Sequence, residues 1–180
     1  MVESGQNYVI SGQAYTGLRP ESTAGVLPAD WALAREHGMV LRVASEPGPA
    51  VEARELLRRL YGEPQQCGEQ SPYLAGHARF QVTLPGEREK TEGGGMEYRY
   101  WPDLRLGYIE NVQVTPGLRR RGVGVRLIRF ALEHLRRLGA DSVHAFTVSP
   151  QGFSLLTGAG FAPEPAGDAG SPWRCWLTAK

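Results

Sequence analysis

The chain has 180 residues, of which 41% are hydrophobic and 22% are charged; these fractions are typical of one folded domain and exclude wholesale disorder. The 20 Lys and Arg residues nearly balance the 19 Asp and Glu residues and give a net charge of +1, which argues against a general nucleic-acid-binding protein. Cys67 and Cys175 form no CxxC pair, so we expect neither a structural metal site nor a disulfide framework. This cysteine usage, with no signal-peptide pattern and no apolar run of about 18–20 residues, predicts a cytoplasmic protein outside the membrane.

Residues 1–38 are rich in Gly, Ser, Thr and Pro, and they are predicted to form an irregular N-terminal extension with one short helix near 29–36. Residues 39–180 are predicted to form a single domain, in which alternating apolar residues mark strands and helical spacing marks helices. A charged segment that ends in three glycines, 85–95, is predicted to be a flexible hairpin connection. In chain order, the expected elements of the domain are strand 39–44, helix 50–61, strand 77–84, strand 96–101, strand 107–114, helix 122–138, strand 143–148, helix 153–157, and strands 161–163 and 173–178.

The segment from Ile109 to Val125 joins a strand to a long helix through a loop that contains glycines. The first backbone N–H groups of a helix have no partner within the helix, and the helix dipole places about half a positive charge there. Gly122 and Gly124 carry no side chains that would block an anion from these donors, and the arginines at 119–121 add cationic groups. The pattern therefore predicts a site for a phosphate-bearing ligand.

Two common phosphate-binding motifs do not fit this loop. Gly117 and Gly122 have the spacing of a Walker loop, but Val123 stands where that motif needs lysine. A dinucleotide-binding fingerprint that begins at Gly122 would need a third glycine where the chain has Leu127. A nucleic-acid surface built on the three arginines is a further interpretation, which the balanced net charge disfavours.

The loop instead resembles the signature of the GNAT superfamily of acyl-CoA-dependent N-acetyltransferases, Gln/Arg-x-x-Gly-x-Gly/Ala after a strand. Arg119, Gly122 and Gly124 match that signature. The similarity is closest over residues 107–161 and extends more loosely over 39–178. It implies an α/β (α+β) fold, with a mixed, mostly antiparallel central sheet that is splayed by a bulge and flanked by helices.

The resemblance also implies that the chain transfers an acetyl group from acetyl-CoA to a primary amine, with no metal ion. The strand edge would pair with the pantetheine amides, and the loop backbone would hold the pyrophosphate. The acceptor is not identified by the sequence and is either a small molecule or a protein amine; a homodimer is compatible with the resemblance. The cofactor-binding residues that it implies are Val112, Gln113, Val114, Arg119, Arg120, Arg121, Gly122, Val123 and Gly124.

Glu110 is the candidate general base. A lysine-like amine has a pKa of about 10 and must lose a proton before it attacks a thioester. Glu110 precedes Val112 and Val114 by two and four residues, so a regular strand would place the three on one face, whereas a bulge would re-aim the carboxylate. Many relatives place a carboxylate near this point. The alternative is a strand carboxylate that is paired with an arginine.

The groups that would stabilise the intermediate and protonate the leaving group are less defined. The Val112 N–H is the candidate oxyanion donor. Where the family often has a tyrosine and an asparagine, this chain has Leu156 and Ser149, so the general acid is open among Ser149, Tyr108 and His144. A thiolate is a tolerable leaving group because a thiol has a pKa of about 8.5. The missing tyrosine also leaves open a module that binds acyl-CoA without catalysis.

Overall fold

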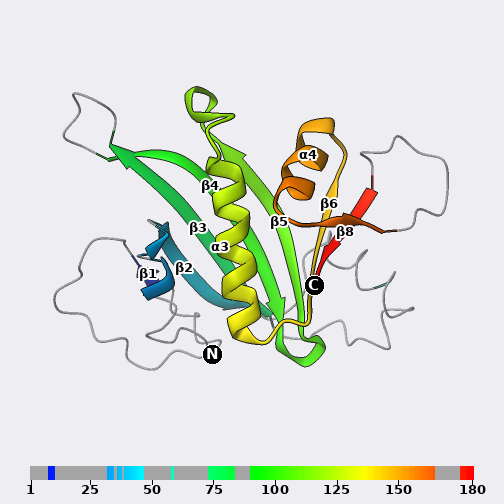
Figure 1. Cartoon of the computed structure of the whole chain (residues 1–180). Helices are drawn as coiled ribbons and strands as arrows, with labels where there is room; N and C mark the ends of the chain where they lie inside the picture. Colours follow the sequence, from blue (N-terminus) through cyan, green and yellow to red (C-terminus); the bar gives the residue numbers. More distant parts are fainter. Residues whose placement is uncertain are drawn as a thin grey trace.

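The computed structural model describes residues 8–10, 32–34, 36–37, 39–46, 58, 73–83, 90–164 and 175–180. Its strands form one open sheet in the order β1-β2-β3-β4-β5-β6-β8-β7 (Figure 1). Neighbouring strands are antiparallel, except for the parallel pair β5 and β6. The mixed, mostly antiparallel sheet that the sequence predicts is confirmed. The strands are β1 (Tyr8–Ile10), β2 (Met39–Glu46), β3 (Tyr73–Thr83), β4 (Lys90–Trp101), β5 (Leu106–Val114), β6 (Ser142–Thr147), β7 (Ala162–Pro163) and β8 (Cys175–Ala179).

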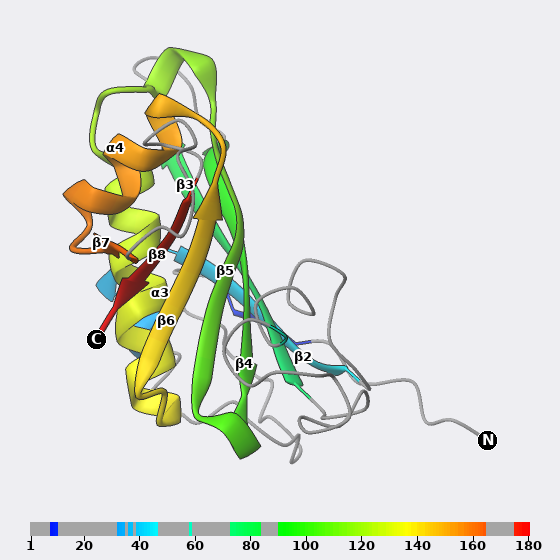
Figure 2. The same ribbon diagram turned by 90° about the vertical axis from the view of Figure 1, so that its right-hand side faces the viewer.

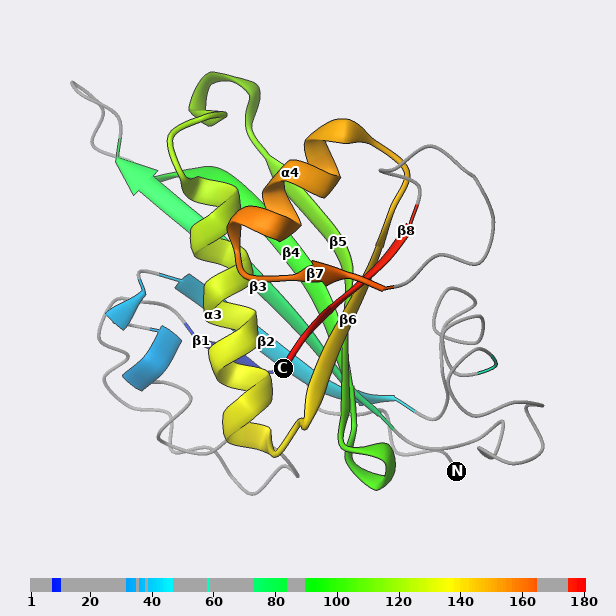
Figure 3. The same cartoon turned by 45° about the vertical axis from the view of Figure 1, so that its right-hand side comes forward.

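Helices α3 (Val123–Leu138) and α4 (Pro150–Gly158) lie side by side on one face of the sheet (Figures 2 and 3). Two short 3-10 turns flank β5, η2 (Pro102–Leu104) before it and η3 (Pro116–Leu118) after it. The predicted apolar stripe of α3 is buried against the sheet, and its arginines are exposed. The α3 helix is bounded by glycines in the left-handed region, Gly122 at φ 78° and Gly139 at φ 105°.

The core is divided by the sheet into two parts. Between α3 and the sheet lies the larger hydrophobic cluster, to which Tyr98 and Ile109 contribute. Successive strand residues point to opposite faces, and Trp101 and Tyr108 accordingly belong to a second cluster that also contains Tyr73. We call the side of the sheet with this smaller cluster the second face.

Several expected elements differ at their ends from those observed. The helix expected at 50–61 lies outside the described residues except at position 58, and 32–34 and 36 are helical as expected. Residues 8–10 form β1 within the segment that the sequence predicts to be irregular. The helix expected at 153–157 begins earlier, at Pro150, because Ser149 caps it.

The prediction of a flexible connection through residue 95 is wrong for its second half, because β4 begins at Lys90 and contains all three glycines. A Cβ atom at Gly94 would lie 2.7 Å from the Gln113 carbonyl oxygen of β5, and 3.2 Å and 3.3 Å from Leu127 and Val123 of α3. The missing side chain at Gly94 therefore allows α3 and β5 to approach β4 closely, which is a packing requirement rather than a sign of flexibility.

The predicted bulge is present in β5, and Glu110 is its extra residue. On one side of it Glu97 pairs with Asn111, on the other Tyr98 pairs with Ile109, so Glu110 has no partner on β4. The parallel pairing of β5 with β6 also ends here, at Ile109 and Ala145. Beyond this point β5 continues to Val114 without pairing to β6, and the splayed sheet is confirmed.

Candidate functional site

A cleft of about 1150 Å³ lies where β5, α3 and α4 meet. The end of β5, the loop before α3 and the start of α4 line it, together with glycines of β4. Among the predicted site residues, Arg121 and Glu110 are not part of this lining. Those that line it are Val112, Gln113, Val114, Arg119, Arg120, Gly122, Val123, Gly124 and Ser149.

The loop before α3 presents backbone donors to the cleft. Arg120, at φ 58°, and Gly122, at φ 78°, both adopt the left-handed conformation, which is uncommon for a residue other than glycine and clusters at functional sites. Gly122 caps α3 without a side-chain hydrogen bond, and a Cβ atom there would meet nothing within 4 Å. The space beside Gly122 is thus open, and the first residues of α3 line the cleft. Because the first N–H groups of a helix have no partner within it, this end of α3 suits an anion.

Gly124 has a different role from the one expected. A Cβ atom at this position would lie 2.9 Å from a methyl carbon of Leu155 in α4 and 3.4 Å from Val114. The missing side chain therefore lets α3 pack against α4, which is a packing role that the sequence analysis did not predict. The residue still forms part of the wall of the cleft.

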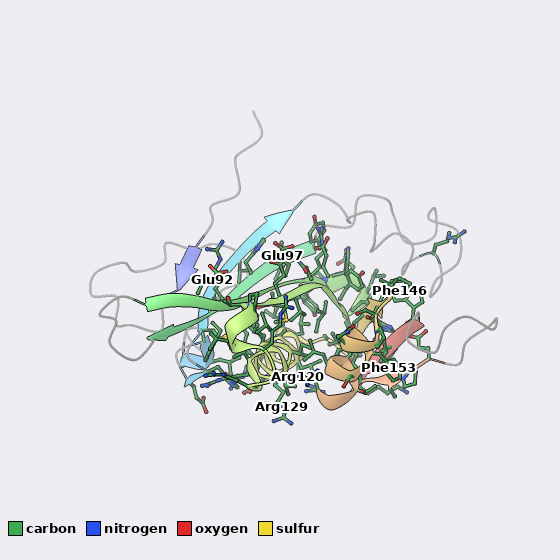
Figure 4. The ribbon with its side chains drawn as sticks, turned by 90° about the horizontal axis from the view of Figure 1, so that it is seen from above. Glu92, Glu97, Arg120, Arg129, Phe146 and Phe153 are labelled. Carbon is green, nitrogen blue, oxygen red and sulfur yellow. The ribbon has the colours of Figure 1, made fainter. Side chains whose placement is uncertain are left out.

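The three arginines of the loop are placed differently. The Nε atom of Arg119 donates a hydrogen bond to the Val114 carbonyl oxygen at 3.3 Å, which ties the loop to the end of β5. Arg120 and Arg121 are exposed, and Arg120 lies on the helical side of the sheet (Figure 4). Glu92 is the acidic residue of the lining, and it pairs with Arg79 at 3.4 Å.

Glu110 points to the second face, where its carboxylate is held by Arg99 of β4. Arg99 donates from Nε to Oε2 at 2.7 Å and from Nη2 to Oε1 at 3.0 Å. Val112 and Val114 pack against the larger core on the other side of the sheet. Of the two alternatives, a regular strand and a bulge, the structure has the bulge, which re-aims Glu110 away from the face of Val112 and Val114.

The guanidinium of Arg99 also stacks on an aromatic ring of the second face. The Arg99 guanidinium carbon lies 4.6 Å from the centre of the Tyr73 ring. Burial lowers the pKa of Arg99, but hydrogen bonding to Glu110 and Tyr73 and their charges outweigh this, so that the pKa is raised above its usual value. Arg99 therefore remains a cation. The sequence analysis missed Arg99, although its place among the polar alternating residues of β4 was visible. It also missed residues of β4 and α4 that line the cleft, among them Glu92, Gly94, Gly95, Gln151, Gly152 and Leu155.

Ser149 lies in the cleft wall and acts as the N-cap of α4. Its Oγ atom accepts a hydrogen bond from the Gly152 N–H at 3.0 Å, and its own N–H donates to the Thr147 Oγ1 atom at 3.3 Å. The Ser149 hydroxyl hydrogen remains available for donation. Leu156, at the position where the family often has tyrosine, is buried in the core.

The other two candidates for a general acid lie away from the cleft. Tyr108 is buried in the second cluster, with its ring 6.1 Å from that of Trp176. His144 is buried and contacts Ser142 at 3.0 Å, Glu164 at 3.1 Å and Thr178 at 3.0 Å. These contacts link β6 to β8 and to Glu164, which follows β7. His144 therefore holds together strands at the edge of the sheet.

Two broader properties can be stated for the described part of the chain. It contains no group of three or more His, Cys, Asp or Glu residues that could hold a metal ion. None of its helices has the length and apolar character needed to cross a membrane.

A family model described as the acetyltransferase (GNAT) family matches residues 50–154, which is more than half of the chain. The chain therefore belongs to the GNAT acetyltransferase family. No curated protein gives a significant match.

Solved structures with a similar fold include nourseothricin acetyltransferase, which is 20% identical at a TM-score of 0.44, over 59% of this chain and 64% of that one. Tetrahymena GCN5 is 14% identical at a TM-score of 0.43, over 57% and 66%. The PaiA N-acetyltransferase from Thermoplasma acidophilum, in complex with coenzyme A, is 15% identical at a TM-score of 0.44, over 73% and 80%. The matched part thus spans just under two thirds of the first two proteins.

Proposed function

We propose that this protein is an N-acetyltransferase that transfers the acetyl group of acetyl-CoA to a primary amine. The observation that carries the proposal is the cleft at the start of α3, where residues of the loop before α3 and the end of β5 that is not paired with β6 line the same space. Membership of the GNAT family supports acyl-CoA as the donor. The proposed acceptor is the amine of a small molecule or of a protein, and a cytoplasmic location and a homodimer belong to the same proposal.

The donor would bind along two backbone segments. The N–H groups around Gly122 and Val123, with the positive end of the helix dipole, suit the pyrophosphate, and Arg120 and Arg121 add charge beside them. The main chain of β5 at 112–114 lies in the lining and has no strand partner on the β6 side. Its N–H and C=O groups can therefore pair with the pantetheine amides.

The acetyl carbon would then lie near the bulge, between the cleft and Glu110. Glu110 accepts a proton from the amine as the nitrogen attacks the thioester carbonyl. The Val112 N–H stabilises the oxyanion of the tetrahedral intermediate, and the C–S bond breaks as that intermediate collapses. CoA leaves as a thiolate, and the Ser149 hydroxyl in the cleft wall is the group available to protonate it.

The proposal is tested by thermal shift with acetyl-CoA and by release of free CoA in the presence of a panel of amines. Replacement of Glu110 by Gln should lower kcat about a hundredfold or more and leave the affinity for acetyl-CoA unchanged. Glu97→Gln is the matched control, because Glu97 lies on β4 opposite Asn111 and pairs with His77 at 3.4 Å. The proposal fails if acetyl-CoA neither stabilises the protein nor releases CoA with any amine.

A second candidate function is a module that binds acyl-CoA without transferring the acyl group. Two observations favour it, the burial of Leu156 at the usual tyrosine position and the pairing of Glu110 with Arg99. It predicts stabilisation by acetyl-CoA with no CoA release. Turnover that disappears in Glu110→Gln would exclude it.

A further inference from the structure

The ion pair on the second face has a geometry that suits catalysis as well as stability. We infer that Arg99 is a positioning residue, which holds the carboxylate of Glu110 in the orientation needed to accept the proton of the amine. This inference rests on the proposed function, since it concerns the same proton transfer. Arg99 itself does not line the cleft.

Both oxygen atoms of Glu110 are engaged by Arg99. The contacts of 2.7 Å and 3.0 Å come from Nε and Nη2, so the planar guanidinium meets the planar carboxylate through two hydrogen bonds. A carboxylate held in this way cannot rotate freely. Each oxygen keeps a further lone pair, and the carboxylate can therefore still accept a proton while it is held.

Arg99 is itself held in place on the second face. Tyr73 stacks against the guanidinium at 4.6 Å, and the Tyr73 ring in turn contacts the Trp101 ring at 5.5 Å. The side chains of Arg99 and Glu110 are only 15% and 17% exposed. Two other carboxylates of β4 are more exposed and form longer ion pairs. Glu97 is 44% exposed and Glu92 is 52% exposed, and each lies 3.4 Å from its partner. The pair at Glu110 is thus closer and better shielded from water than its neighbours.

The bulge explains why such a clamp is needed. The backbone of Glu110 is not paired with any residue of β4, and the pairing of β5 with β6 ends at the preceding residue. The neighbouring strands therefore do not constrain this backbone position as they constrain a paired one. The contact from the Arg99 side chain of β4 therefore determines where the Glu110 carboxylate lies. Glu110 comes two residues before Val112, which lines the cleft.

The test compares Arg99→Met, Arg99→Lys and the wild type. Arg99→Met keeps the apolar stem but removes both hydrogen bonds, and kcat should fall about tenfold to a hundredfold, because a catalytic group displaced by about 1 Å loses that much. The KM for acetyl-CoA should not change. Arg99→Lys keeps the charge and one contact, and it should recover part of kcat. Arg105→Met is the control, since it breaks an exposed ion pair to Asp141 at 2.8 Å.

An exchange of the two residues separates positioning from stability. Arg99→Glu combined with Glu110→Arg keeps opposite charges on the two strands but moves the carboxylate to β4. The melting temperature should recover relative to the single variants, while kcat should stay low. Recovery of kcat in this double variant, or an unchanged kcat in Arg99→Met, would overturn the inference.

Failure of the proposed function gives a different result. A wild type that releases no CoA with any amine refutes that function directly. The positioning of the Glu110 carboxylate by Arg99 is then tested by crystal structures of the wild type and of Arg99→Met. In the variant, the carboxylate should leave the position that it has in the wild type. An unmoved carboxylate would show that Arg99 does not position it.

Discussion

Gly94 offers a sharp test of the packing beneath the cleft. It lies in β4 under the first turns of α3, where it pairs with Val114 of β5. Both Gly94 and the neighbouring β5 residue Gln113 line the cleft. In Gly94→Ala the added carbon would be 2.7 Å from the Gln113 carbonyl oxygen, whereas ordinary contact begins at 3.4 Å. This oxygen belongs to the backbone of β5, so relief requires the two strands or the helix to move.

The expected magnitude combines two opposing effects. Overpacking of a filled site costs about 1–3 kcal/mol, and replacing glycine by alanine in a regular element stabilises by about 0.5–1 kcal/mol. A net loss of about 1–2 kcal/mol follows for Gly94→Ala. For a chain of this size, each kcal/mol corresponds to about 2–4 °C, so the melting temperature should fall by about 2–8 °C.

The assay is thermal unfolding followed by acetyl-CoA titration, with Gly117→Ala as the matched control. A Cβ atom at Gly117 meets nothing within 4 Å, so this variant should keep or slightly raise the melting temperature. Gly94→Ala should also bind acetyl-CoA more weakly, because its wall of the cleft moves. If Gly94→Ala were as stable as Gly117→Ala, β4 would not be packed as described.

Three further outcomes are expected. Ser149→Ala should lose about 1 kcal/mol of stability because the cap of α4 is removed, and Ser149→Asp should restore it; equal melting temperatures for all three proteins would contradict this role. Arg120→Ala should weaken acetyl-CoA binding about tenfold and reduce its dependence on salt, whereas Arg129→Ala, exposed outside the lining, should not. Burial and the charge of Asp141 raise the pKa of Tyr100 above its usual value, although Arg105 acts in the opposite direction. The folded state therefore favours the neutral form of Tyr100. That stability is complete below about pH 10 and is lost as pH rises through the raised pKa, and the loss should be smaller in Tyr100→Phe in alkaline unfolding experiments.

The sequence was sufficient to predict the elements with strong periodicity. The stripe of α3 and the strands before and after it are found close to their expected bounds, because burial on one face imposes the spacing. The loop before α3 could be singled out as a candidate phosphate site because its family signature places glycine and arginine at set positions. The sequence also contains a signal for the start of α4, since Ser149 followed by Pro150 is a typical helix beginning. The sequence analysis did not use this signal and predicted that the helix begins at residue 153.

The parts that were missed depend on contacts between segments. Three glycines in a row suggest a loop, and only the approach of Gln113 and α3 shows why β4 needs glycine at position 94. The pairing of Glu110 with Arg99 depends on which residue of β5 bulges, and a one-residue insertion leaves no local pattern. A strand carboxylate paired with an arginine is among the sequence-based alternatives, but the sequence does not say which arginine is the partner.

The bulge links the two halves of the candidate site. Without an extra residue, Glu110 would share the face of Val112 and Val114 and would point toward α3. With it, the strand presents Val112 and Val114 to the helical side, where the cleft lies, and the carboxylate to the second face. The same position ends the pairing with β6. In the proposed reaction, a donor bound in the cleft and an amine approaching from the second face would therefore meet where the pairing of β5 with β6 ends. Arg99 would hold the proposed base, Glu110, beside that point.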